Sequence, residues 1–185
     1  MDPVDVAADL DRVLLSESAI ADRLAALAAQ IDKDYAGTDI LLVGVLKGAI
    51  MVMADLARAL HTPVAIEWMA ISSYGSGTTS SGVLRILKDL DTDVAGRHVL
   101  VVEDVLDSGL TLDWLRHTLI ARGVASLRVM TLLRKPEAVA NHIEVDYLGF
   151  DIPDEFVVGY GLDYAERYRN LRCVAVLAPA AIASR

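Results

Sequence analysis

Three carboxylates lie close together near the middle of the 185-residue chain, where an apolar run meets a turn. Glu103 and Asp104 directly follow the apolar residues 99–102, and Asp107 comes three positions later. Like charges at this spacing repel one another, so they indicate a site for a cation or for a ligand rich in hydrogen-bond donors. The adjacent pair could accept hydrogen bonds from sugar hydroxyls or help to hold a hydrated magnesium ion.

A turn with the composition of a phosphate cradle follows these carboxylates. Its residues are Ser108, Gly109, Leu110 and Thr111. The start of a helix offers backbone N–H groups, the hydroxyls add donors, and glycine lets the backbone approach a phosphate. The glycine-lysine pattern of a Walker loop is absent. Taken alone, such a turn could simply cap a helix, but the whole strand–carboxylate–turn–helix unit favours a binding site.

The elements around this unit alternate between strands and helices. Helical spacing of apolar residues predicts helices over 16–35, 49–60 and 111–122. Strands are expected over 39–46, 63–72, 84–87, 98–103 and 126–133, with shorter β segments at 147–150 and 156–160. This alternation predicts one α/β domain over 1–185, with a mostly parallel twisted sheet flanked by helices. Ligands bind at the carboxyl ends of the strands in such sheets.

The composition is that of a folded globular protein, with 54% apolar and 23% charged residues. The net charge of −9 argues against a nucleic-acid partner, because such partners are bound chiefly by lysine and arginine clusters. The single cysteine, Cys173, excludes an intrachain disulfide. No signal-peptide pattern is present and the longest apolar runs are too short to cross a membrane, so we expect a cytoplasmic protein without membrane contact.

A polar segment with two open interpretations follows the second predicted strand. It contains Ser73 and Tyr74 and continues to residue 81 almost without apolar side chains. This composition is typical of a surface loop. The loop could close over a reacting centre to exclude water, or it could be an ordinary polar connection.

The carboxylate unit closely resembles the phosphoribosyl-diphosphate signature of type I phosphoribosyltransferases, and other segments narrow the resemblance to the hypoxanthine-guanine branch. Residues 45–48 are similar to that branch's pyrophosphate loop, and residues 71–75 to its flexible loop. Residues 132–136 are similar to its base-recognition lysine segment, and residues 151–164 to its purine hood. Arg169 stands where the branch has an arginine that contacts pyrophosphate. The resemblance implies that residues 145–185 and the N-terminal segment form a small hood over the base.

The resemblance also implies roles for the residues that meet the phosphoribosyl donor. Glu103 and Asp104 would bind the ribose hydroxyls and the associated Mg²⁺, while Asp107 would handle the proton at N7 of the purine. The turn 108–111 would hold the 5-phosphate of the donor. The pyrophosphate would be bound by Leu46, Lys47 and Gly48 together with Arg169, and the Leu46–Lys47 peptide bond is a candidate for the cis isomer.

A second set of implied roles concerns the base. Lys135 would donate to O6 of a 6-oxopurine, and an adenine amino group would leave this contact unpaired. Phe156 would stack on the purine ring and Val157 would offer backbone groups. Asp163, in the same hood segment, would contact a second Mg²⁺ linked to the pyrophosphate.

The activity implied is purine salvage: Mg²⁺-dependent transfer of the phosphoribosyl group to hypoxanthine or guanine, giving IMP or GMP, by a homodimer or homotetramer. Two positions are notable: Glu155, where family members carry lysine, and Arg134, an added charge near the base. One alternative is a phosphoribosyltransferase for orotate, uracil or adenine, against which Lys135 and Phe156 argue. Another is a regulatory protein with the same fold, against which Asp107 and the acidic charge argue.

Overall fold

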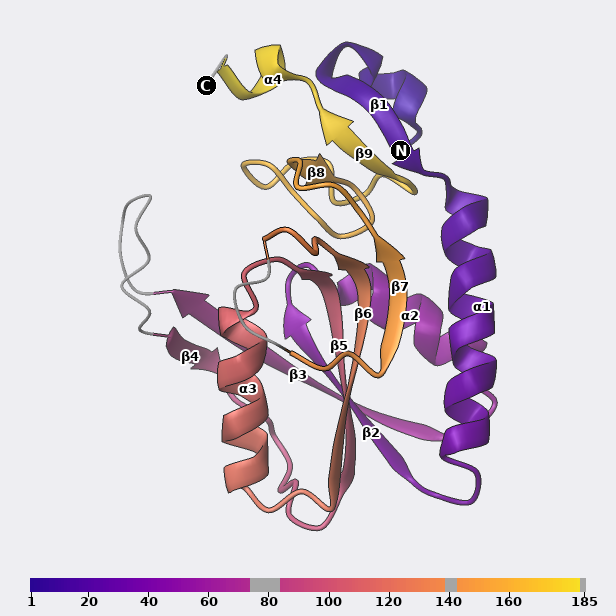
Figure 1. Ribbon diagram of the computed structural model, residues 1–185, viewed down its shortest axis with the longest axis vertical. Helices are drawn as coiled ribbons and strands as arrows, with labels where there is room; N and C mark the ends of the chain where they lie inside the picture. Colours follow the sequence, from indigo (N-terminus) through magenta and orange to yellow (C-terminus); the bar gives the residue numbers. More distant parts are fainter. Residues whose placement is uncertain (74–83, 139–142, 184–185) are drawn as a thin grey trace.

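The computed structural model describes residues 1–73, 84–138 and 143–183, and its centre is a six-stranded sheet (Figure 1). The strands are β2 (Ile40–Leu46), β3 (Val64–Ser73), β4 (Leu84–Lys88), β5 (His98–Leu106), β6 (Ser126–Arg134) and β7 (Tyr147–Asp151), in the order β4-β3-β2-β5-β6-β7. All neighbours pair in parallel except β4, which runs antiparallel to β3. This confirms the mostly parallel sheet.

Helices cover both faces of this sheet (Figure 1). They are α1 (Glu17–Asp34), α2 (Ile50–Ala59) and α3 (Leu110–Ala121). Successive side chains of a strand point to opposite faces, so Leu42 packs in a core with α1 and α2, whereas Leu41 packs in a core with α3. Burial on both faces explains why the central strands are continuous apolar runs. Ser16 caps α1 by accepting from the backbone N–H of Ala19.

A second, three-stranded sheet lies above the carboxyl ends of the large sheet (Figure 1). It contains β1 (Leu10–Leu15), β9 (Val174–Leu177) and β8 (Val157–Val158), in the order β1-β9-β8 with antiparallel pairing. The short helices η1 (Pro3–Asp9) and α4 (Pro179–Ala183) flank it. The two ends of the chain therefore meet in one small layer over the edge where ligands are expected.

Two strands have boundaries that differ from those expected by more than one residue. β5 continues to Leu106, because Val105 and Leu106 still pair with β6, so Asp104 lies in the strand with Glu103 and not in the turn. β8 has only two residues, since the chain enters left-handed backbone at Gly159 (φ 96°) and Tyr160 (φ 50°). Among the described residues, no helix is long and apolar enough to span a membrane.

Candidate active site

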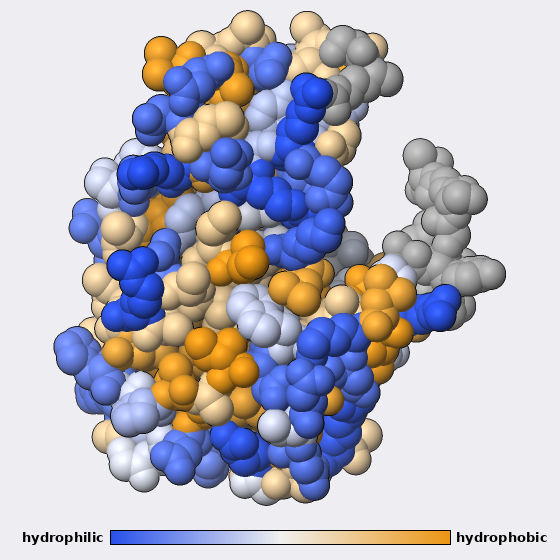
Figure 2. All heavy atoms as spheres, turned by 180° about the vertical axis from the view of Figure 1, so that it is seen from behind, coloured by the Kyte–Doolittle hydropathy of each residue, from blue (hydrophilic) through white to orange (hydrophobic). Residues whose placement is uncertain are grey.

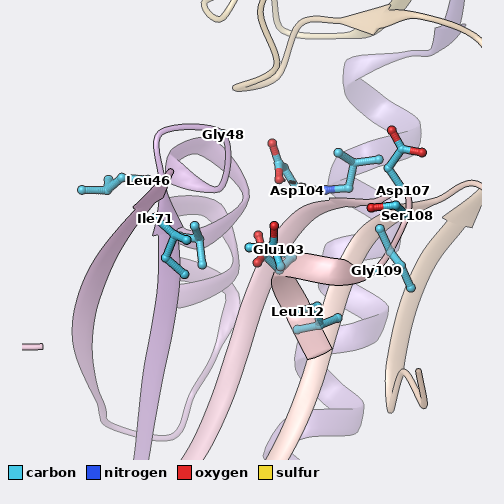
Figure 3. A pocket seen from close by; sticks show the side chains of 13 residues that line it. Leu46, Gly48, Ile71, Glu103, Asp104, Asp107, Ser108, Gly109 and Leu112 are labelled. Carbon is cyan, nitrogen blue, oxygen red and sulfur yellow. Dashed lines mark hydrogen bonds between the residues drawn. The ribbon is translucent and has the colours of Figure 1, made fainter. Parts of the chain in front are cut away.

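A cavity of about 290 Å³ opens at the carboxyl ends of β2 and β5, beside the start of α3 (Figure 3). Its lining combines three of the segments singled out in the sequence. These are the end of β2 with the following loop, the end of β5, and the β5–α3 turn, represented by Leu46, Gly48, Glu103, Asp104, Asp107, Ser108, Gly109 and Thr111. Most of the residues assigned to the phosphoribosyl donor thus surround one hollow.

The two adjacent carboxylates of β5 lie against this cavity in different surroundings (Figure 3). Glu103 is 7% exposed, and burial together with the charge of Asp104 raises its pKa well above the usual range. Burial also raises the pKa of Asp104 to about 6, although the backbone N–H of Val105 donates to it at 2.9 Å and Arg169 offsets part of the effect. Both carboxylates are therefore short of partners and are suited to a cation or a hydroxyl-rich ligand.

Glycines let the loop after β2 pack against Asp104 and let the hood segment pack against that loop. A Cβ atom on Gly48 would lie 1.7 Å from Oδ2 of Asp104. A Cβ atom on Gly161, where φ is 101°, would lie 2.0 Å from the carbonyl oxygen of Gly48. No larger residue fits at either position without displacing this layer. The peptide bond between Leu46 and Lys47 is cis, as the resemblance implied.

Arg169 extends from the hood toward the same point. Its Nη1 donates to the carbonyl oxygen of Gly161 at 2.8 Å, and its Nη2 lies 2.7 Å from Oδ1 of Asp163. Lys47 reaches this group through Glu166, whose Oε2 is 3.1 Å from Nζ of Lys47 and 3.4 Å from Nη2 of Arg169. The cations assigned to pyrophosphate therefore converge. Sequence reasoning missed Glu166, for which the only signal was an acidic residue between the hood motif and the arginine.

The β5–α3 turn has the geometry of an anion site. Gly109 is the N-cap of α3 and adopts the left-handed conformation, with φ of 82°. The first backbone N–H groups of a helix, here those of Leu110 and Thr111, have no partners within the helix and attract negative charge. Asp107 precedes them with a side chain that is 57% exposed. The turn can hold a phosphate on one side and present a carboxylate on the other.

The residue assigned to base recognition lies beside this carboxylate. Lys135 follows β6, its side chain is 11% exposed, and its backbone N–H donates to the carbonyl oxygen of Leu106. Its Nζ lies 3.8 Å from Oδ2 of Asp107 and 3.4 Å from Oδ1 of Asp154. Asp154 was not singled out in the sequence, because nothing in its surroundings there distinguishes it from a solvent-exposed loop residue.

The charge on the neighbouring Arg134 is directed elsewhere. Its guanidinium makes two hydrogen bonds to Asp151, at 2.7 and 3.0 Å, across the ends of β6 and β7. Glu155 is likewise engaged, in an ion pair with Arg12 of β1. Both positions noted in the sequence therefore serve contacts between elements.

In the hood, the exposed ring of Phe156 directly precedes the buried strand β8. Phe156 is 47% exposed and meets Tyr164 edge to face, with ring centroids 5.5 Å apart. Val157 is buried in β8, paired with Val176. Phe156 follows Asp154, the partner of Lys135, by two positions, and its exposed ring offers a face for a planar ligand.

The structure describes two of the assignments, the loop that begins at Ser73 and the metal ligands, only in part. Ser73 ends β3, whereas Tyr74 and the rest of the expected loop to residue 81 lie outside the described residues. In the described part of the chain, no three acidic, histidine or cysteine side chains are grouped as a metal cage. The donor set still fits Mg²⁺, because this ion is typically held by one or two carboxylates, with phosphates and water completing its shell.

The fold and this site together are those of a phosphoribosyl transferase domain, and the family model of that description matches residues 13–165. The chain belongs to the hypoxanthine-guanine phosphoribosyltransferase family. It is 57% identical to the hypoxanthine-guanine phosphoribosyltransferase of Mycobacterium tuberculosis, over 92% of this chain and 88% of that protein. It is 48% identical to that of Bacillus subtilis, over 93% of this chain and 96% of that protein.

A solved structure supports the same assignment. The crystal structure of a hypoxanthine phosphoribosyltransferase from Staphylococcus aureus superposes with a TM-score of 0.92. It shares 45% sequence identity, and the match covers 95% of this chain and 96% of that chain. The similarity therefore includes the small sheet as well as the large one.

Proposed function

We propose that this chain transfers the phosphoribosyl group of 5-phosphoribosyl 1-diphosphate to N9 of hypoxanthine or guanine, giving IMP or GMP and pyrophosphate. The observation that carries the proposal is the distance of 3.8 Å between Lys135 and Asp107. It joins the segment assigned to the base with the segment assigned to the donor. A bound 6-oxopurine would then meet a cationic donor and a carboxylate at neighbouring points of its edge.

The reaction exchanges one bond at the anomeric carbon for another. The bond from C1 to the diphosphate oxygen breaks, a bond from C1 to N9 of the base forms, and the base loses the proton at N7. Asp107 is the acceptor for that proton. Its negative charge also stabilises the positive charge that sugar transfer develops on the ribose.

The donor is held at its two ends by different devices. We assign the 5-phosphate to the N–H groups and hydroxyls of Ser108, Gly109, Leu110 and Thr111. We assign the diphosphate to Lys47, Gly48 and Arg169 with Leu46, because charged donors converge there. Holding both phosphates fixes C1 next to Asp107, which is how positioning contributes to the rate.

Glu103 and Asp104 are assigned to the ribose hydroxyls and to Mg²⁺ that enters with the donor; a second ion on the diphosphate would meet Asp163. When bound, Mg²⁺ neutralises phosphate charge on the leaving group. The raised pKa values of Glu103 and Asp104 favour this assignment, since a cation restores the charged form of each carboxylate.

Base selection is assigned to Lys135, to stacking on Phe156 and to backbone groups of Val157. A 6-oxo group accepts from the ammonium, whereas the 6-amino group of adenine offers a second donor and leaves the lysine unpaired. The ion pair between Arg134 and Asp151 keeps the extra positive charge out of this contact.

An assay with six bases tests the proposal. The wild-type protein is given phosphoribosyl diphosphate and Mg²⁺ with hypoxanthine, guanine, xanthine, adenine, uracil or orotate, and nucleotide formation is followed by absorbance. We expect turnover of hypoxanthine or guanine only in the presence of Mg²⁺, with adenine and the pyrimidines inert. Turnover of adenine, uracil or orotate alone would overturn the base assignment, and no turnover at all would favour the regulatory alternative.

We further propose one domain over 1–185, in which residues 145–185 and the N-terminal segment cover the base, acting in the cytoplasm as a homodimer or homotetramer. Apolar side chains on the surface support subunit contact, among them Ile50 at 41% and Ile66 at 43% exposure, and orange patches interrupt the hydrophilic surface in Figure 2. Sedimentation of the purified chain tests the oligomeric state.

A further inference from the structure

One carboxylate contacts both of the side-chain cations that are assigned to the diphosphate. A single oxygen of Glu166, Oε2, lies 3.1 Å from Nζ of Lys47 and 3.4 Å from Nη2 of Arg169. These cations come from segments far apart in the chain, the loop after β2 and the end of the hood. An oxygen between two cations stands where an oxygen of a bound diphosphate would make the same contacts.

The backbone sets the position of this carboxylate. Glu166 has a φ of 63° and follows Ala165 with a φ of 51°, so two consecutive residues with Cβ atoms are left-handed. Hydrogen bonds between Tyr164 and Arg167 close the turn, and the N–H of Glu166 donates to Asp163 at 2.8 Å. Residues held in this conformation are kept there by their surroundings and are frequent at ligand clamps.

The two acidic partners of Arg169 differ in how easily they can leave. Asp163 is 27% exposed, lies 2.7 Å from the guanidinium and is also held by the backbone of Glu166. The side chain of Glu166 is 66% exposed and pairs with the ends of two long side chains, Lys47 and Arg169. An exposed ion pair of this kind is weak, so the carboxylate can swing into solvent when a stronger anion arrives.

We infer that Glu166 is a built-in competitor of the diphosphate: in the free protein its carboxylate occupies the cations that bind the diphosphate of the donor, and it is displaced when the donor binds. This inference rests on the proposed function of the site. The neighbouring Lys47 lowers the pKa of Glu166, so the competitor is charged at neutral pH. It weakens the binding of the donor and of the product pyrophosphate, and it speeds product departure by returning to the cations.

The test compares Glu166→Gln with the wild type and with Asp89→Asn. The control also removes one exposed carboxylate from an ion pair, with Arg122, but at the end of α3 opposite the turn. Binding of inorganic pyrophosphate with Mg²⁺ is measured by calorimetry, and kcat and KM are measured with hypoxanthine or guanine. We expect Kd for pyrophosphate and KM for the donor to fall about three- to tenfold in Glu166→Gln, with kcat not increased and KM for the base unchanged.

Salt provides a second signature. The difference in pyrophosphate affinity between Glu166→Gln and the wild type should shrink as ionic strength rises, because salt screens the ion pairs of Glu166 with the two cations. Asp89→Asn should match the wild type at every salt concentration. Unchanged or weaker pyrophosphate binding in Glu166→Gln would refute the inference and make Glu166 a positioning group for the cations.

Two measurements keep the inference separate from other failures. Melting temperatures of all variants are compared, and Glu166→Ala, which must show the same tightening, replaces Glu166→Gln should the latter be unstable. Turnover by the wild type decides the proposed function independently. A wild type that turns over normally beside a Glu166→Gln variant with unaltered affinity contradicts only the inference, whereas an inactive wild type contradicts the proposed function.

Discussion

The two ends of the central sheet treat carboxylates in opposite ways. At the amino end, Asp32 accepts from the backbone N–H groups of His61 at 3.0 Å and Thr62 at 2.9 Å. Burial alone would raise its pKa, but these hydrogen bonds outweigh burial and lower the pKa to about 2. Asp34, close by, accepts from the hydroxyl of Tyr147 at 2.9 Å. These carboxylates stabilise the folded chain as it stands.

At the carboxyl end, Glu103 is buried and Asp104 is half-buried, and the pKa values of both carboxylates are raised. The backbone N–H of Val105 donates to Asp104, but this bond does not outweigh desolvation. The folded protein is therefore less stable at neutral pH than it would be with neutral side chains at these positions. Sites that tolerate such a cost are typical of ligand binding, because the ligand supplies the missing partners. The difference between the two ends separates carboxylates that maintain the fold from carboxylates that await a substrate.

Replacing Asp107 by Asn, at the carboxyl end of the sheet, should have the largest effect on activity. The amide cannot accept the proton of the base, so we expect kcat to fall about 10²–10⁴-fold. Donor binding should be nearly unchanged, since the phosphates are held by other groups. Steady-state kinetics and calorimetry with the donor check both parts. An Asp107→Asn variant that retains full turnover would contradict the role assigned to the carboxylate.

Replacing Lys135 by Gln should give the next largest effect. A hydrogen bond from a charged group is lost, and kcat/KM for hypoxanthine or guanine should fall about 10- to 100-fold. Arg134→Gln is the matched control, because its guanidinium is bound to Asp151 and does not serve the base in our assignment. Equal losses in both variants would show that charge near the cavity matters and that a specific contact with O6 does not.

The elements that position the site were largely predictable from the sequence, and the reason is burial. β2 and β5 are covered on both faces, so their sequences are unbroken apolar runs. β1 was missed because it carries two consecutive charged residues, Asp11 and Arg12, and it pairs with β9 from the other end of the chain. The end of β5 was placed too early, because Asp104 resembles the start of a turn until the pairing of Val105 and Leu106 with β6 is seen.

In the candidate site, residues within one local motif were predictable and contacts between motifs were not. The residues from Glu103 to Thr111, apart from Leu110, line the cavity together with the end of β2. Asp154 and Glu166 acquire meaning only from the cations that the fold brings to them, Lys135 in one case and Lys47 in the other. Such partners depend on the approach of the hood to the sheet, which single-sequence patterns do not encode.

The pH dependence of the unfolding free energy, compared between Asp104→Asn and the wild type, tests the effect of the carboxyl-end site on stability. The pKa of Asp104 in the folded protein, about 6, exceeds its ordinary value of 3.8, so protonation favours the folded state. This contribution is complete below the ordinary value and is lost as pH rises through about 6. At pH 7.5, without ligand, we expect Asp104→Asn to be more stable than the wild type by about 2 kcal/mol, while its binding of the donor with Mg²⁺ is weaker.

Denaturant unfolding of both proteins between pH 4 and pH 7.5 measures this difference. The difference in unfolding free energy should increase with rising pH and decrease toward pH 4. A constant difference would mean that the carboxylate is not strained by burial in the free protein. The two ends of the sheet would then differ in sequence but not in energetics.

Asp32→Asn examines the opposite end and should have the smallest effect on function. The folded pKa of about 2 lies below the ordinary 3.8, so Asp32 stabilises the fold above the ordinary value, and this contribution is lost as pH falls through about 2. We expect the variant to lose about 1–2 kcal/mol at pH 7, because the remaining amide oxygen is uncharged and satisfies the two N–H groups poorly. Unfolding free energies at pH 7 and near pH 2 should show the loss shrinking, with kcat unchanged at neutral pH. An equal loss of unfolding free energy at both pH values would assign the effect to side-chain shape and not to charge. A fall in kcat would contradict the division between carboxylates that maintain the fold and carboxylates that bind substrate.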